Sequence, residues 1–298
     1  MSRRRFSLCA LILLWPAIVW AAPLKVVATY SVLGDIVKNV GGDRIALSVL
    51  VGPDADTHTF EPTPKENVLL AKAEVVFENG LHFEHWLDKL YQASGCKAPR
   101  VVASDGVEPI ELAASPIKEV DPHIWHDVAN AMVMTEQVRD GLIAVDGANA
   151  EYYQQSAQKY LGRLAALDHW VIDTLKDIPD EHRKLVTSHD TFGYFARRYG
   201  FTVVGAAIES ATTEAADPSA AQIAQLVDKI KAAGVNTVFT EAMRNPKLMG
   251  SVAREAHVQV APQLYTDALG LQDSDADSYI KMMEHNVRIL AEFLGDVS

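Results

Sequence analysis

The chain has 298 residues, of which 49% are apolar and 22% charged, so we expect a folded protein too long for one small core. Its formal charge is −12 and its basic residues cluster densely only at positions 3–5, which argues against a nucleic-acid-binding protein. The sequence has no P-loop, GxSxG, HExxH or GxGxxG motif, which argues against several common enzyme classes.

Residues 1–21 are predicted to be a secretory signal peptide. Three arginines at positions 3–5 precede an apolar run over about residues 6–18, and small residues follow, with cleavage expected after Ala21 or the next residue. The run is short for a membrane span, and its cysteine lies too early for a lipid anchor. We therefore expect a soluble periplasmic protein, in which Cys96 is the only cysteine left and has no disulfide partner.

Short β-rich runs alternate with helical patterns in both halves of the remaining chain. Strands are predicted at 24–31, 46–51, 74–80, 100–104, 184–188, 202–208, 237–242 and 258–265. Helices are predicted at 33–40, 64–72, 84–93, 190–199, 218–233, 246–256 and 276–294. This alternation is typical of α/β folds with parallel sheets.

The middle of the chain, from Asp127 to about Lys176, has no strand signal. Four apolar residues within it fall on one helical stripe: Leu164, Leu167, Val171 and Leu175. We therefore predict two α/β lobes, each with a mainly parallel sheet, joined by one long rigid helix. The predicted units are an N-terminal lobe over 22–147, a linking helix over 148–178 and a C-terminal lobe over 179–298.

Three histidines and one aspartate share a position just past a predicted strand or at a strand-to-helix turn. They are His58, His123, His189 and Asp267. Ligands of α/β sheets bind outside the carboxyl ends of the strands, so these side chains would meet if both lobes face one cleft. Three imidazoles and one carboxylate suit Zn²⁺ or another first-row divalent ion, whereas Ca²⁺ and Mg²⁺ prefer oxygen ligands.

Each of these residues also has an ordinary explanation. A single loop histidine is more often a solvated side chain, and Asp267 alone is more often a turn former or a helix cap. His126 is a rival to His123, although the Asp-Pro turn before His123 favours the latter. His82 and His85 form an i, i+3 pair, which on a surface helix is more often incidental.

An ordered series of motifs spans the chain: DTHTFEPTP, NGLHFEHWLDKL, DPHIW, VTSHDTFGYFARRYGF, TEA and LYTDALG. In this series the chain resembles the metal-binding solute-binding proteins of zinc and manganese ABC importers, the TroA-like cluster A-I family. The resemblance implies two lobes joined by a rigid helix, and a monomer that delivers its ion to an inner-membrane ABC permease without catalysis. It also implies the ligand set His58, His123, His189 and Asp267.

The resemblance leaves the identity of the metal open. Zinc-dedicated members often carry a histidine-rich loop, and residues 111–125 hold no histidine before His123. Manganese-dedicated members tend to have glutamate where this chain has His189. Nitrogen-rich sites bind zinc more tightly than manganese, so we expect Zn²⁺ first and Mn²⁺ next. Glu61 and Glu241 are candidates to fix the imidazoles through hydrogen bonds.

Two functions of other classes remain as alternatives. A secreted zinc hydrolase would use three histidines and a water, but Asp267 would close the open position, and no metal-protease motif supplies a general base. A metal-binding adhesin would need the same ligands and no permease.

Overall fold

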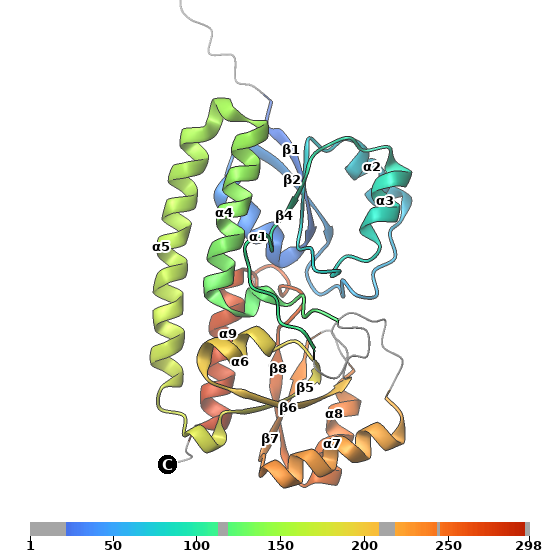
Figure 1. Ribbon diagram of the computed structural model, residues 1–298, viewed down its shortest axis with the longest axis vertical. Helices are drawn as coiled ribbons and strands as arrows, with labels where there is room; N and C mark the ends of the chain where they lie inside the picture. The colour runs from blue at the N-terminus through green and yellow to red at the C-terminus, as the bar shows by residue number, and fades with distance from the viewer. Residues whose placement is uncertain (1–21, 113–118, 209–217, 243–244, 296–298) are drawn as a thin grey trace, which may run out of the picture.

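The computed structural model describes residues 22–112, 119–208, 218–242 and 245–295 (Figure 1). The predicted signal peptide lies outside the described residues. Among the described helices, none is both long and apolar enough to cross a membrane.

The N-terminal part is built on a four-stranded parallel sheet with the strand order β2-β1-β3-β4. Its strands are β1 (Leu24–Tyr30), β2 (Ile45–Val51), β3 (Val75–Glu78) and β4 (Arg100–Val102). Three helices connect them: α1 (Ser31–Gly41), α2 (Pro64–Ala71) and α3 (Leu87–Ser94). The sheet is buried between helical layers, which explains the continuous apolar runs of β1 and β3.

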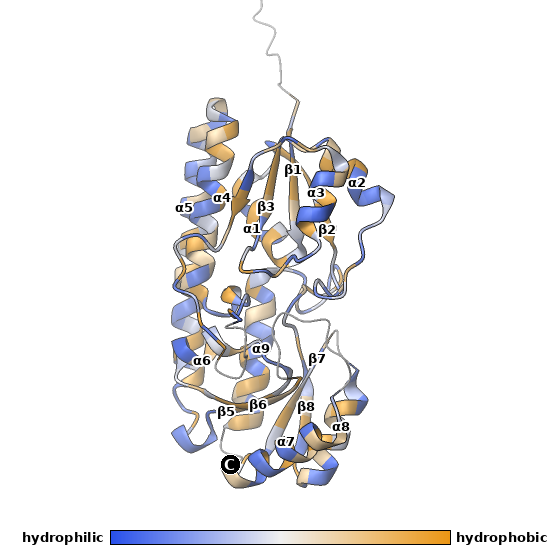
Figure 2. Cartoon of the chain, turned by 45° about the vertical axis from the view of Figure 1, so that its right-hand side comes forward, coloured by the Kyte–Doolittle hydropathy of each residue, from blue (hydrophilic) through white to orange (hydrophobic). Residues whose placement is uncertain are grey.

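The C-terminal part contains two pairs of parallel strands, with β5 beside β7. The pairs are β5 (Lys184–His189) with β6 (Thr202–Ile208), and β7 (Thr237–Glu241) with β8 (Gln259–Leu264). The helices are α6 (Gly193–Tyr199), α7 (Ala220–Ala233), α8 (Pro246–Ala256) and α9 (Tyr279–Leu294). Figure 2 shows helices α7 and α8 beside β7 and β8, with many polar residues on these helices.

Two helices occupy the middle of the chain, α4 (Val128–Val145) and α5 (Ala150–Leu175). The longer helix α5 runs along one side of both parts (Figure 1) and packs against α1, α4 and α9. Its predicted apolar stripe is buried: Leu164, Leu167, Val171 and Leu175. The α/β fold with parallel sheets and a long joining helix is therefore confirmed.

Some boundaries differ from the prediction because turns with left-handed backbone interrupt the pattern. The strand expected over 74–80 ends at Glu78, and Gly80, Leu81 and His82 then have φ values of 83°, 54° and 62°. This turn delays the helix expected from residue 84, so that α3 begins at Leu87. Cys96 is buried.

Candidate metal centre

The ends of the strands bring four side chains together in a buried cluster between the two parts of the molecule. His189 is the last residue of β5, and Asp267 follows β8. His58 lies in the loop after β2, and His123 immediately precedes the 3₁₀ turn η1 (Ile124–His126). All four are at most 2% exposed, and their potential ligand atoms lie within 4.8 Å of one another.

The spacing of these atoms fits a small ion with four ligands. The Nε2 atoms of His58 and His123 are 3.3 Å apart. Asp267 places Oδ1 3.3 Å from His123 Nε2, and Oδ2 3.1 Å from His189 Nε2 and 3.7 Å from His58 Nε2. A tetrahedral ion with bonds of about 2.0–2.1 Å holds its ligands about 3.3 Å apart. The cluster therefore has the dimensions of a site for a first-row divalent ion.

Glu241 holds the imidazole of His189 from behind. Its Oε2 accepts a hydrogen bond from His189 Nδ1, which directs Nε2 toward the cluster. Its Oε1 accepts from the backbone N–H groups of Ser188 (2.8 Å) and His189 (3.0 Å), and Thr266 Oγ1 donates to Oε2 (3.1 Å). Because Glu241 is the last residue of β7, adjacent strand ends place the two side chains together.

Asp121 does the same for His123. Its Oδ1 accepts from His123 Nδ1 (2.8 Å) and from the backbone N–H of His123 (2.9 Å), and Asp121 is fully buried. Sequence reasoning did not identify Asp121. The available signal was its position two residues before the histidine of DPHIW, where a carboxylate can fold back onto both nitrogens.

Glu61 lies elsewhere. It is exposed and lines a surface hollow of about 1000 Å³ between α2 and α3, together with Phe60, Val68 and Trp86. Of the two glutamates predicted to fix the imidazoles, the structure thus places only Glu241 against one.

The remaining candidate histidines stand apart from the cluster. His126 is buried and stacks on Phe192, with ring centroids 4.8 Å apart, and neither ring nitrogen makes a hydrogen bond within the described structure. Burial, aided by the nearby His123, lowers the pKa of His126 to about 3, so the ring is neutral. His82 and His85 are exposed in the turn before α3.

Aromatic side chains wall the cluster on the side of the N-terminal sheet. The ring of Phe83 meets His58 edge-on at 5.0 Å, and Trp125 lies 5.4 Å from His123. Trp125 Nε1 donates to Thr266 O (2.8 Å), which ties this wall to the loop that carries Asp267. The wall excludes water and lowers the local dielectric, which strengthens ion–ligand attraction.

The charges in the cluster support one another when no ion is bound. Burial opposes a charge on His189, but Glu241 and Asp267 outweigh it and raise the pKa of His189 to about 10. Asp121 and Asp267 likewise raise the pKa of His123 against the effect of burial. Burial would raise the pKa of Asp267, yet His189 and His123 hold it well below its usual value. A metal cation that displaces the protons from these imidazoles therefore binds beside carboxylates that are already ionised.

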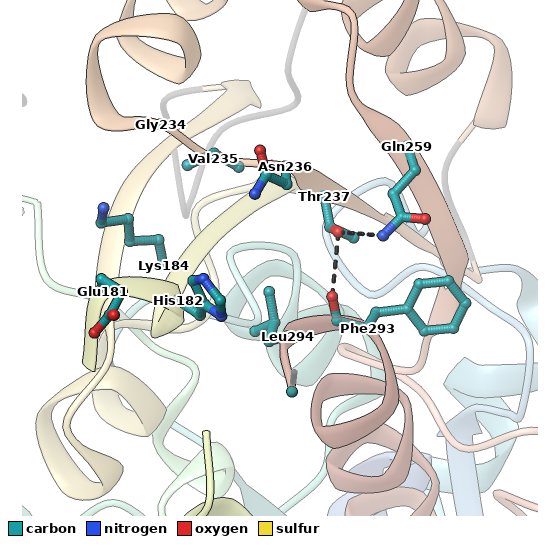
Figure 3. Close-up of a pocket in the computed structure, with 11 residues that line it drawn as sticks. Glu181, His182, Lys184, Gly234, Val235, Asn236, Thr237, Gln259, Phe293 and Leu294 are labelled. Carbon is teal, nitrogen blue, oxygen red and sulfur yellow. Dashed lines mark hydrogen bonds between the residues drawn. The ribbon is translucent and has the colours of Figure 1, made fainter. Parts of the chain in front are cut away.

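A second hollow lies at the opposite, amino end of the C-terminal strands (Figure 3). It measures about 170 Å³, and two of its polar side chains form a chain of hydrogen bonds: Gln259 Nε2 donates to Thr237 Oγ1 (2.8 Å), which donates to Phe293 O (3.3 Å). Lys184 Nζ donates to Ala233 O (2.7 Å). Among the described residues, only the buried cluster groups three or more metal-ligating side chains.

Comparison with known proteins agrees with the geometry. The family model "ZnuA: Zinc-uptake complex component A periplasmic" matches residues 26–293. The manganese-binding lipoprotein MntA of Halalkalibacterium halodurans is 36% identical over 264 residues, which cover 89% of this chain and 86% of MntA. The iron-binding protein YfeA of Yersinia pestis is 30% identical over 276 residues, or 92% of this chain and 88% of YfeA.

The fold comparison gives the same result. The periplasmic zinc-binding protein TroA from Treponema pallidum superposes with a TM-score of 0.84 and 27% identity, covering 93% of this chain and all of TroA. The family match spans nearly the whole described chain, and the buried His/Asp cluster lies between its two parts. The chain therefore belongs to the ZnuA/TroA family of metal-binding solute-binding proteins, the non-enzymatic capture components of manganese and zinc ABC importers.

Proposed function

We propose that the protein captures one divalent transition-metal ion with His58, His123, His189 and Asp267 and delivers it to an ABC permease. The observation that carries this assignment is the convergence of four buried side chains whose ligand atoms lie within 4.8 Å of one another. Asp121 and Glu241 hold two of the imidazoles with Nε2 toward the ion, so little ordering is required on binding. The carboxylate of Asp267 takes the fourth position, where a catalytic zinc would keep a water.

The donor set and the relatives bear differently on the identity of the metal. Three nitrogens and one carboxylate favour zinc over manganese at equal free concentration. The relatives described above are named for manganese, iron and zinc. From the donor set we propose that zinc binds most tightly in vitro. Because manganese recurs among the relatives' names, we also propose that manganese is carried where free zinc is scarce.

Competition titration tests the metal preference. Chelator-stripped mature protein is titrated with zinc in the presence of manganese, with each free ion buffered. Zinc is expected to displace manganese at equal free concentration. Displacement of zinc by manganese would contradict the preference, whereas failure of both ions to bind would contradict the metal site itself.

The proposed delivery takes place in the periplasm, after export directed by the signal peptide predicted over residues 1–21. A lobe over 22–147 and a lobe over 179–298 would each supply ligands, with the helix over 148–178 between them. We propose that the protein acts as a monomer. Size-exclusion chromatography with light scattering, with and without metal, tests this last point.

A further inference from the structure

Tyr194 on α6 fastens the segment that precedes His123. The side chain is fully buried, and its Oη donates a hydrogen bond to the backbone oxygen of Asp121 (2.9 Å). The same Oη accepts from the backbone N–H of Ile110 (3.2 Å), and Asp121 N donates to Ile110 O (2.9 Å). Three hydrogen bonds thus form a closed ring that joins α6 to the residue holding His123.

Two neighbours of Tyr194 strengthen this attachment. A Cβ on Gly193 would lie 2.6 Å from Asp121 Oδ2, so glycine lets α6 approach that carboxylate closely. Arg197 lies over the Tyr194 ring at 5.1 Å and donates to Glu108 O (3.2 Å). Helix α6 is therefore hydrogen-bonded to Glu108 and Ile110 as well as to Asp121.

The same helix follows directly from β5, whose last residue is His189. One imidazole of the cluster is thus joined to α6 through the chain, and another through Tyr194 and the Asp121 carboxylate. We propose that Tyr194 is a positioning residue that keeps His123 and His189 in register, so that both hold the ion at once. This inference rests on the proposed metal-binding function. Removing the Tyr194 hydroxyl frees the Asp121 segment, and the ion then dissociates faster.

Tyr199 on the same helix provides a matched control. It is also buried, and its Oη makes two hydrogen bonds, accepting from Val128 N (3.4 Å) and donating to Asp168 Oδ1 (3.0 Å). Neither partner holds one of the four cluster side chains. A purely structural role for the tyrosine hydroxyls on α6 predicts similar effects of Tyr194→Phe and Tyr199→Phe.

The test measures zinc dissociation by stopped flow into excess chelator, alongside the Tm of the metal-free proteins. Tyr194→Phe is expected to release zinc about tenfold faster than the wild type, whereas Tyr199→Phe stays within about twofold. Gly193→Ala, which presses on Asp121 Oδ2, should accelerate release as Tyr194→Phe does. In zinc-loaded Tyr194→Phe, the NMR signal of the His123 Nδ1–H should also broaden, which lost stability alone would not cause.

Unchanged release in Tyr194→Phe would overturn the inference, as would equal acceleration in Tyr194→Phe and Tyr199→Phe that follows the loss of Tm. The two proposals fail separately. Wild-type protein that does not bind zinc contradicts the metal site, whereas tight wild-type binding with unchanged release in Tyr194→Phe contradicts only the role of Tyr194.

Discussion

Glu241→Gln removes the charge behind His189 while keeping the shape of the side chain. Glu241 accepts four hydrogen bonds, three of them from Ser188 and His189 and one from Thr266. The amide of glutamine has only one accepting atom, so an N–H group would face one set of these donors. The imidazole of His189 would lose both its orientation and part of its basicity. Changes of this kind cost about 10–100-fold in metal affinity, which corresponds to about 1.4–2.7 kcal/mol.

The assay is a competitive titration of stripped protein against a fluorescent zinc chelator, at fixed pH and ionic strength. Glu61→Gln is the matched control, because Glu61 is an exposed glutamate in the hollow between α2 and α3. We expect Glu241→Gln to lose at least tenfold in affinity and Glu61→Gln to bind as the wild type does. Wild-type affinity in Glu241→Gln, or an equal loss in Glu61→Gln, would show that Glu241 does not support metal binding through His189.

Three further outcomes are expected. Alanine in place of any one cluster residue should abolish tight metal binding in isothermal titration; the cluster residues are His58, His123, His189 and Asp267. His126→Leu and His82→Ala should leave tight binding in place. Since an ion must displace the proton from His189, whose pKa is raised to about 10, the apparent metal affinity should rise between pH 6.5 and about 10. The same raised pKa stabilises the fold of the ion-free protein below pH 6.5, and this stabilisation is lost as pH rises through about 10. A metal affinity that does not change with pH would contradict this. Thr63→Ala breaks the capping box of α2 and should lower the free energy of unfolding by about 1 kcal/mol in urea titration, with metal affinity unchanged.

The order of elements and the four clustered side chains were predictable from sequence for a physical reason. Strand and helix periodicities differ, and parallel strands place the residues at their carboxyl ends on one edge of a sheet. His189 and Asp267 could therefore be assigned to the same place although 77 positions separate them in the numbering. The burial of the α5 stripe followed from its periodicity in the same way.

What sequence could not supply was the set of contacts behind the imidazoles. Glu61 and Glu241 were equal candidates, because their distinction depends on β7 lying beside β5. Tyr194 escaped notice because its hydrogen bond to Asp121 is set by the packing of α6 against a distant segment. Asp121 had a local signal, its place two residues before His123, which was not used. The shift of α3 to Leu87 depends on left-handed backbone at non-glycine residues, which propensity does not indicate.

X-ray absorption spectroscopy of zinc-loaded protein, combined with metal analysis, tests whether the four clustered side chains bind one ion. We expect one ion per chain, coordinated by three imidazole nitrogens and by carboxylate oxygen at about 2.0–2.2 Å. The imidazole contribution should fall in His123→Ala and remain whole in His126→Leu. A stripped protein that takes up no ion, or a spectrum with fewer than three imidazoles or with sulfur from Cys96, would contradict it.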